Sequence, residues 1–167
     1  MIDRATRPRI YVGGPHRATS RWGLVQNVRR AEDLGLLVFT MGGIPVITHR
    51  MYENYSDLPE EYWAEACRSL LSTCHAMAVN VSRERSLESS GTTDEIEVSR
   101  QDLKPIFYDE PPVPHEYLGH DFLTVAGDLQ KWIARWREVH MLTRDDLPRE
   151  QAQHWDAGTS TRGSGHE

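Results

Sequence analysis

Apolar and polar positions along the chain follow two alternating patterns. Short β-prone runs occur at 9–12, 44–48, 76–81 and 105–108, each bounded by glycine, proline or polar residues. In the segments at 24–41 and 59–74, apolar residues recur every three or four positions, as on one face of a helix. With a further helical segment at 91–103, the pattern predicts the order strand, helix, strand, helix, strand, helix, strand.

Short buried strands that alternate with amphipathic helices are typical of parallel βαβ units with right-handed crossovers. We therefore predict an α/β fold with a doubly wound, Rossmann- or flavodoxin-like parallel sheet of four to five strands in three α/β/α layers. Pro45 can only stand near the start of its strand or in an edge strand, because proline lacks the N–H of the ladder. A chain of 167 residues fits one domain of this kind.

The C-terminal part differs from this repeat. A proline-rich connector is expected at 109–114, followed by a helix within about 123–141. The apolar residues of this helix share one side: Leu129, Trp132, Ile133, Trp136 and Val139. That stripe must pack against the sheet or against a second subunit. The predicted domain therefore spans 8–141, and 142–167 is expected to be a flexible tail because it has little apolar content.

Composition and charge limit the kinds of partner that the protein is expected to bind. The formal net charge of −6 argues against binding a nucleic acid polymer, which needs clustered Lys and Arg, and favours a small-molecule partner. No run approaches the roughly 20 apolar residues of a membrane span, and the first residues lack the apolar core of a signal peptide. We expect a cytoplasmic protein with no membrane partner.

The two cysteines are expected to be reduced. Cys67 and Cys74 are seven positions apart on one predicted helix. This places them roughly 10 Å apart along the helix axis, too far for a disulfide.

Ligands of open parallel sheets bind at the carboxyl ends of the strands, which selects the loops 13–21, 48–54 and 82–95. The third loop gives the clearest indication. Ser89-Ser90-Gly91-Thr92 leads into a predicted helix whose free N–H groups can hold a phosphate, and Glu95 follows one turn later. The local alternative is that Ser89 and Thr92 only cap the helix and that Glu95 is solvated.

These residues also resemble a known family. The pattern Ser89-x-Gly91-Thr92-x-x-Glu95 is similar to that of the nucleoside 2-deoxyribosyltransferase superfamily, most closely its small phage and bacterial members and its nucleoside 5′-monophosphate N-hydrolases. Further positions carry the same resemblance: Tyr11, Gly13 and Gly14 after the first strand, Asn27 and Ala31 in the next helix, and 45–49 at the second strand. The resemblance covers about residues 8–108.

The resemblance implies a reaction and a site. Glu95 would attack the anomeric carbon of the sugar, release the base and form a glycosyl ester, since a carboxylate stabilises an oxocarbenium-like transition state. Tyr11 would orient Glu95, and Ser89 would contact the 5′-phosphate, as in the hydrolases. The implied substrate site also includes Gly13, Gly14, Gly91 and Thr92. The resemblance implies no cofactor, a nucleotide or nucleoside as partner, and a homodimer or higher homo-oligomer.

Two charged candidates lie in the other loops at this end of the sheet. His49 ends the second strand and is a candidate for contact with base or phosphate. Arg17, in the first loop, is a candidate for neutralising a phosphate. The alternative for both is an ordinary solvated side chain.

The chain departs from the family where the leaving base would be protonated. The family commonly has two aspartates eight residues apart, the first of which is the general acid; here these positions are Cys67 and His75. A thiol is a poor proton donor, so His75 or Glu65 is the candidate acid. The open alternatives are therefore an N-hydrolase, a deoxyribosyltransferase and a non-catalytic nucleotide-binding module.

Two other interpretations are weaker. A phosphoribohydrolase of the lysine-decarboxylase-like group shares the Gly-Thr-x-x-Glu turn, but the Pro-Gly-Gly run that precedes it there is missing. A metal site at His115 and His120 is not expected, because two histidines five apart do not share a helical face.

Overall fold

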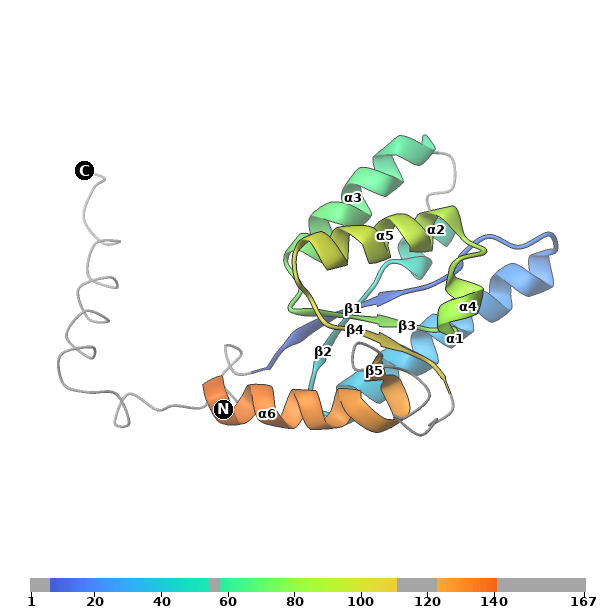
Figure 1. Ribbon diagram of the computed structural model, residues 1–167. Coiled ribbons are helices and arrows are strands. Elements are labelled where there is room, and N and C mark those ends of the chain that lie inside the picture. Colours follow the sequence, from blue (N-terminus) through green and yellow to red (C-terminus); the bar gives the residue numbers. More distant parts are fainter. Residues whose placement is uncertain (1–6, 55–57, 111–122, 141–167) are drawn as a thin grey trace, which may run out of the picture.

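The computed structural model describes residues 7–54, 58–110 and 123–140. Within them, one all-parallel sheet has the strand order β2-β1-β3-β4-β5 (Figure 1). The strands are β1 (Arg9–Gly13), β2 (Ile44–Ile47), β3 (Ala76–Val79), β4 (Ile106–Tyr108) and β5 (Leu123–Thr124). The predicted α/β class is confirmed, and the order is that of a flavodoxin-like sheet.

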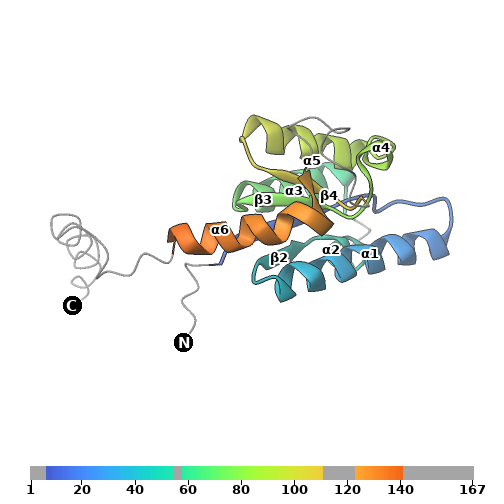
Figure 2. The same ribbon diagram turned by 60° about the horizontal axis from the view of Figure 1, so that its bottom comes forward.

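Helices cover both faces of this sheet. They are α1 (Arg21–Thr40), α2 (His49–Asn54), α3 (Glu60–Ser72), α4 (Arg83–Ser86), α5 (Ser90–Gln101) and α6 (Gln130–His140), with a π-helical turn η3 (Val125–Leu129) before α6. Figure 2 shows α1 and α6 on one side of the sheet and α3 and α5 on the other. This is the predicted three-layer arrangement.

Alternation along β1 assigns its side chains to the two layers. Ile10 and Val12 pack with α1 and α6, whereas Tyr11 packs in the opposite cluster with α3 and α5. Successive side chains of a strand point to opposite faces, so the position of Tyr11 follows from those of its neighbours. Tyr11 is fully buried, on the side of the sheet that α3 and α5 cover.

Pro45 is tolerated because β2 is an edge strand, as predicted. Two short helices lie where loops were expected, α2 at 49–54 and α4 at 83–86. Each is too short for an apolar period to be visible in the sequence. The Ser82 hydroxyl accepts a hydrogen bond from the Arg85 N–H and so caps α4.

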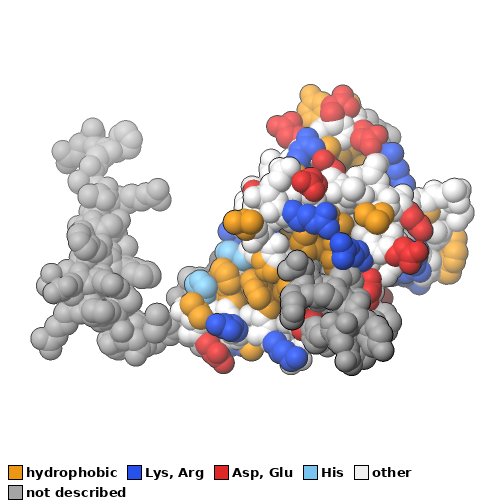
Figure 3. Space-filling view, in the orientation of Figure 1, with side chains coloured by type: hydrophobic (Ala, Val, Ile, Leu, Met, Phe, Trp, Pro, Cys, Tyr) orange, Lys and Arg blue, Asp and Glu red, His pale blue; other side chains and the backbone are white. Residues whose placement is uncertain are grey.

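The apolar stripe that runs from η3 into α6 packs against the sheet. Leu129 and Ile133 are fully buried, and the Trp132 ring lies 5.8 Å from that of Phe107 in β4. Val139, at the far end of the stripe, is 57% exposed. In Figure 3, apolar and histidine side chains meet on this part of the surface.

Several sequence predictions lie outside the described residues. These are the connector beyond Glu110, the His115 and His120 pair and the tail at 142–167. In the part that the structure describes, no helix has the length and apolar character needed to span a bilayer. On the face shown in Figure 3, basic and acidic side chains are interspersed.

Leu103 is strained at the end of α5. It has a φ of 54°, the left-handed conformation that glycine favours after a helix, and the Lys104 N–H bonds the Ser99 carbonyl around it. Its side chain is 90% exposed and contributes little packing.

We expect Leu103→Gly to raise the free energy of unfolding by roughly 0.5–1 kcal/mol. Glycine removes the cost of the left-handed conformation, and its greater entropy in the unfolded chain offsets part of that gain. Urea denaturation measures the change. The matched control is Leu36→Gly, at an exposed position inside α1, which should lose about 1 kcal/mol. A destabilised Leu103→Gly protein would contradict the strain argument.

Candidate functional site

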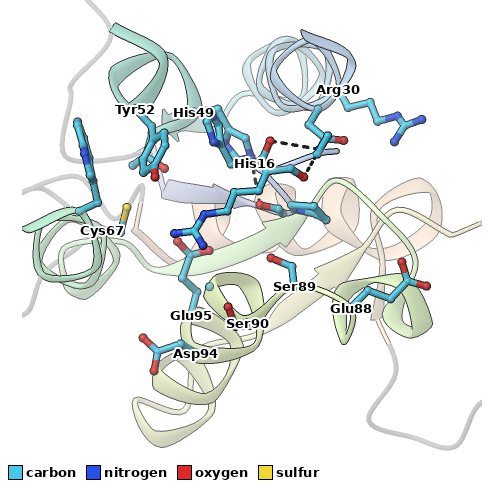
Figure 4. Close-up of a pocket in the computed structure, with 18 of the residues that line it drawn as sticks. His16, Arg30, His49, Tyr52, Cys67, Glu88, Ser89, Ser90, Asp94 and Glu95 are labelled. Carbon is cyan, nitrogen blue, oxygen red and sulfur yellow. Dashed lines mark hydrogen bonds between the residues drawn. The ribbon is translucent and has the colours of Figure 1, made fainter. Parts of the chain in front are cut away.

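A cavity of about 710 Å³ opens at the carboxyl ends of the strands. Its walls come from the loop after β1, from α1, α2 and α3, and from α4, the start of α5 and the segment between them (Figure 4). The strand order reverses between β1 and β3, which is where ligands of such sheets bind. The volume falls within the ~300–1,000 Å³ typical of small-molecule sites.

Glu95 lines this cavity, whereas Tyr11 and Gly13 lie beneath it and do not border the cavity themselves. The Tyr11 hydroxyl donates a hydrogen bond of 2.6 Å to Oε1 of Glu95 and lies 3.3 Å from Oγ1 of Thr48. A β-carbon at Gly13 would lie 3.1 Å from Oε2 of Glu95 and would overlap the Met77 side chain. The absence of a side chain at Gly13 therefore leaves room for the carboxylate, which is held in place through Oε1.

The position of Glu95 changes its acidity. Burial raises the pKa of the Glu95 carboxyl from 4.5 to about 7, and Asp94 adds to the rise, although the hydrogen bond from Tyr11 acts in the opposite direction. Burial, and then the neighbouring Glu95, raises the pKa of Tyr11 well above its usual value, so the phenol stays protonated. A carboxyl group poised near neutral pH in a cavity is characteristic of functional sites.

The start of α5 forms a second part of the wall. Ser89, Ser90 and Gly91 line the cavity, whereas Thr92 is buried and its hydroxyl lies 3.0 Å from Oγ of Ser89. Ser89 is the N-cap, since Oγ also accepts a hydrogen bond from the Thr92 N–H. Ser89 and Thr92 therefore do cap the helix, and Ser89 borders the cavity at the same time. A β-carbon at Gly91 would meet nothing within 4 Å.

His49 is buried in the wall as a neutral ring. Its Nε2 donates to the Gly14 carbonyl at 3.2 Å. Burial, and then the nearby His16, lowers the pKa of His49 from 6.5 to about 4. Gly14 has a φ of 146°, and its Cα lies so close to the Asn80 carboxamide that a side chain would overlap it.

Arg17 lies at the rim and is already paired. Its guanidinium forms an ion pair with Glu60 at the start of α3, and both side chains are more than half exposed. The buried Asn27 side chain donates to the carbonyls of His16 and Arg17, which fixes the loop after β1. Arg17 thus borders the cavity, as a phosphate ligand must, but its positive charge is already paired with Glu60.

Aromatic side chains and a thiol form the other end of the cavity. The Tyr52 ring lies 4.3 Å from His16 and 5.1 Å from Trp63, centroid to centroid. Cys67 lies beside Tyr11 and Thr48, and burial raises the pKa of its thiol. In the view of Figure 4, Glu95 lies between Cys67 on one side and Ser89 on the other.

The structure does not bring His75 or Glu65 to this cavity. His75 precedes β3, so it lies at the amino end of the sheet. There its Nδ1 accepts the Arg9 N–H at 2.9 Å and its ring lies 4.6 Å from that of Trp136. Glu65 is an exposed residue of α3 that does not border the cavity. Neither is in a position to protonate a group bound beside Glu95.

Several wall residues were not singled out as site candidates from the sequence, and Thr48, Tyr52 and Trp63 are among them. Thr48 stands at the carboxyl end of β2, so the strand-end rule alone indicates it. Tyr52 and Trp63 carry no comparable indication, because an aromatic residue on a helix usually packs in the core. Among the residues described, no group of three or more His, Cys, Asp or Glu side chains is placed to hold a metal ion.

Comparison with protein-family models and with curated protein sequences found no match to this chain. The function is therefore argued from the geometry of the cavity.

The raised pKa of Glu95 links stability to pH. A carboxyl group whose pKa is higher in the folded than in the unfolded state stabilises the fold below pH 4.5, and this contribution is lost as the pH rises through 7. The full difference corresponds to roughly 3 kcal/mol at about 1.4 kcal/mol per pKa unit.

We therefore expect Glu95→Gln to be more stable than the wild type at pH 8 by up to roughly 3 kcal/mol, with the gain falling toward zero near pH 4.5. Chemical denaturation across this range measures the difference. His49 has the opposite dependence, losing its contribution as the pH falls from 6.5 toward 4, but it is present in both proteins and cancels. A pH-independent difference would contradict the buried position of Glu95.

Proposed function

We propose that the protein is an N-glycosidase that cleaves the base–sugar bond of a nucleoside 5′-monophosphate, ribose or deoxyribose, with Glu95 as the nucleophile. The observation that carries this proposal is the Glu95 carboxylate, largely buried in a cavity at the strand switch point and held by the Tyr11 hydroxyl at 2.6 Å. A buried carboxylate lowers the stability of the fold, and a role in catalysis would explain its presence in this cavity.

The geometry suits attack on a sugar. The hydrogen bond from Tyr11 fixes Oε1, whereas no hydrogen bond from a described residue reaches Oε2. In the proposed reaction, an oxygen of Glu95 bonds to the anomeric carbon as the bond to the base breaks, and water then hydrolyses the ester. The neutral Tyr11 phenol stabilises the carboxylate before attack and keeps its orientation.

The start of α5 is the proposed phosphate position. The N–H groups of the first helical turn have no partner within the helix, and the helix dipole favours an anion there. Ser89, Ser90 and Gly91 border the cavity at this point. A phosphate bound here would place the sugar over Glu95 and the base toward Tyr52 and Cys67.

A non-catalytic nucleotide-binding module is the second candidate. It is favoured by one observation: neither His75 nor Glu65, the candidate acids, lies in the cavity. In that case nucleotides would bind, and raise the melting temperature with concentration, without being cleaved. A cytoplasmic location and a homo-oligomeric state remain part of the proposal, and light scattering of the purified protein tests the latter.

The nucleophile is tested by base release. Purified protein incubated with a panel of nucleoside 5′-monophosphates should release free base, measured by liquid chromatography. Glu95→Gln should lower the rate at least about a thousandfold, because removal of a nucleophile abolishes the covalent step. Glu97→Gln is the matched control, since Glu97 is an exposed residue of the same helix away from the cavity. Thermal stabilisation by nucleotides without base release would support the binding module instead.

The phosphate position is tested by Gly91→Ala. Because a β-carbon there meets no protein atom within 4 Å, the variant should fold with unchanged or slightly higher stability. A methyl group against a bound phosphate should instead raise KM for 5′-monophosphates several-fold and leave the corresponding nucleosides unaffected. Equal KM values for the variant and the wild type would place the phosphate elsewhere.

A further inference from the structure

The carboxylic acids of this cavity other than Glu95 are poorly placed to protonate a leaving base. Breaking the bond to adenine, cytosine or guanine leaves negative charge on a ring nitrogen, which enzymes neutralise with a general acid worth about 10²–10⁴ in rate. Besides Glu95, the carboxylic acids that line the cavity are Glu60, Glu88 and Asp94. Glu60 is paired with Arg17, and Asp94 with Arg68. In Figure 4, Glu88 lies beyond Ser89, on the side opposite Cys67.

The groups nearer Glu95 are also unsuited to this role. The pKa of His49 is about 4, so at neutral pH its ring is not an imidazolium, and its one N–H, on Nε2, is donated to the Gly14 carbonyl. Cys67 occupies the wall beside Tyr11, but burial makes its thiol a weaker acid than usual. The Tyr11 proton is committed to Glu95. The nucleophile is thus well positioned, and a matching acid among these groups is missing.

The aromatic end of the cavity suits a particular leaving group. The rings of Tyr52 and Trp63, 5.1 Å apart, border the cavity next to Cys67. Aromatic faces attract organic cations by about 0.5–2 kcal/mol through their quadrupole. A flat, positively charged ring would be favoured there, and its charge would be complemented by the nearby Glu95 carboxylate.

We propose that the substrate is a pyridinium nucleotide, whose base carries a positive charge before the bond breaks. This inference rests on the proposed N-glycosidase function. As the bond between C1′ and the ring nitrogen breaks, its electron pair neutralises the pyridinium, and a neutral pyridine leaves without any added proton. A Glu95 oxygen bonds to C1′. Water then replaces Glu95, giving the sugar phosphate and one proton and restoring the carboxylate.

The experiment compares leaving groups on the same enzyme. Nicotinamide mononucleotide and its dinucleotide are offered beside the adenosine, cytidine, uridine and guanosine monophosphates and their deoxy forms. We expect kcat/KM for a pyridinium substrate to exceed that of every ordinary nucleotide at least 100-fold, the lower range of the missing acid contribution. Cleavage of either pyridinium compound supports the proposal.

Failure of the inference and failure of the proposed function give different results. If ordinary nucleotides are cleaved as fast as the pyridinium compounds, the inference is overturned and the N-glycosidase function stands. If nothing is cleaved, both are overturned. A kcat/KM for nicotinamide mononucleotide that falls at alkaline pH would reveal a required acid and would also overturn the inference. A His16→Gln variant that loses activity on ordinary nucleotides but keeps it on pyridinium compounds would overturn it as well, because His16 would then be the acid.

Supplying an acid should shift the preference. Cys67→Asp places a carboxyl group beside Tyr11 and should raise the rate for an adenine nucleotide relative to nicotinamide mononucleotide at least tenfold. Cys67→Asn, of nearly the same shape but unable to donate a carboxyl proton, is the matched control and should not shift this ratio. Because the ratio is taken within each variant, a general loss of folded protein does not affect it. An unchanged ratio in Cys67→Asp would contradict the proposal.

Discussion

The hydrogen bond between Tyr11 and Glu95 joins the fold to the chemistry of the cavity. Its geometry depends on the parallel sheet, because the alternation of β1 directs Tyr11 toward the layer of α3 and α5. The same sheet brings the start of α5 to its carboxyl edge, where Glu95 meets the phenol. The absence of a side chain at Gly13 leaves the space that the Glu95 carboxylate requires, and Gly14 leaves the space taken by the Asn80 carboxamide. Without this bond, the carboxylate would lose the one hydrogen-bond partner that the structure gives it.

Burial in the same region of the protein shifts the pKa values of two ionisable groups, His49 and Glu95. The pKa of His49 is lowered and that of Glu95 is raised because burial of each group disfavours its own charged form. Their contributions to stability vary with pH in opposite directions. The site is therefore a region in which the protein gives up stability at both ends of the pH range, as is common where local structure serves a reaction rather than the fold.

The sequence predicted the framework better than the cavity wall. Strands and long helices follow from apolar periods, so the α/β class, the edge position of Pro45 and the helix of Leu129 and Ile133 were accessible. Glu95 was selected from the strand-end rule and from a family resemblance, Tyr11 from the resemblance alone, and the structure brings them together. His75 was wrongly considered for the cavity, because it directly precedes the strand at 76–79 and so lies at the amino end of the sheet, opposite the ligand edge. A helix as short as α2 shows no apolar period in the sequence, so neither the helix nor its contribution of Tyr52 to the cavity could be predicted.

The edges of the described sheet restrict how copies of this chain can meet. One edge is β2, in which Pro45 has no N–H to offer a neighbouring strand, and the other is β5, which is only two residues long. Edge strands of this kind are poor templates for strand-to-strand addition. Association through the described part is therefore directed to helical surfaces, and growth of a continuous intermolecular sheet, the route to fibrous aggregates, is disfavoured by the architecture itself.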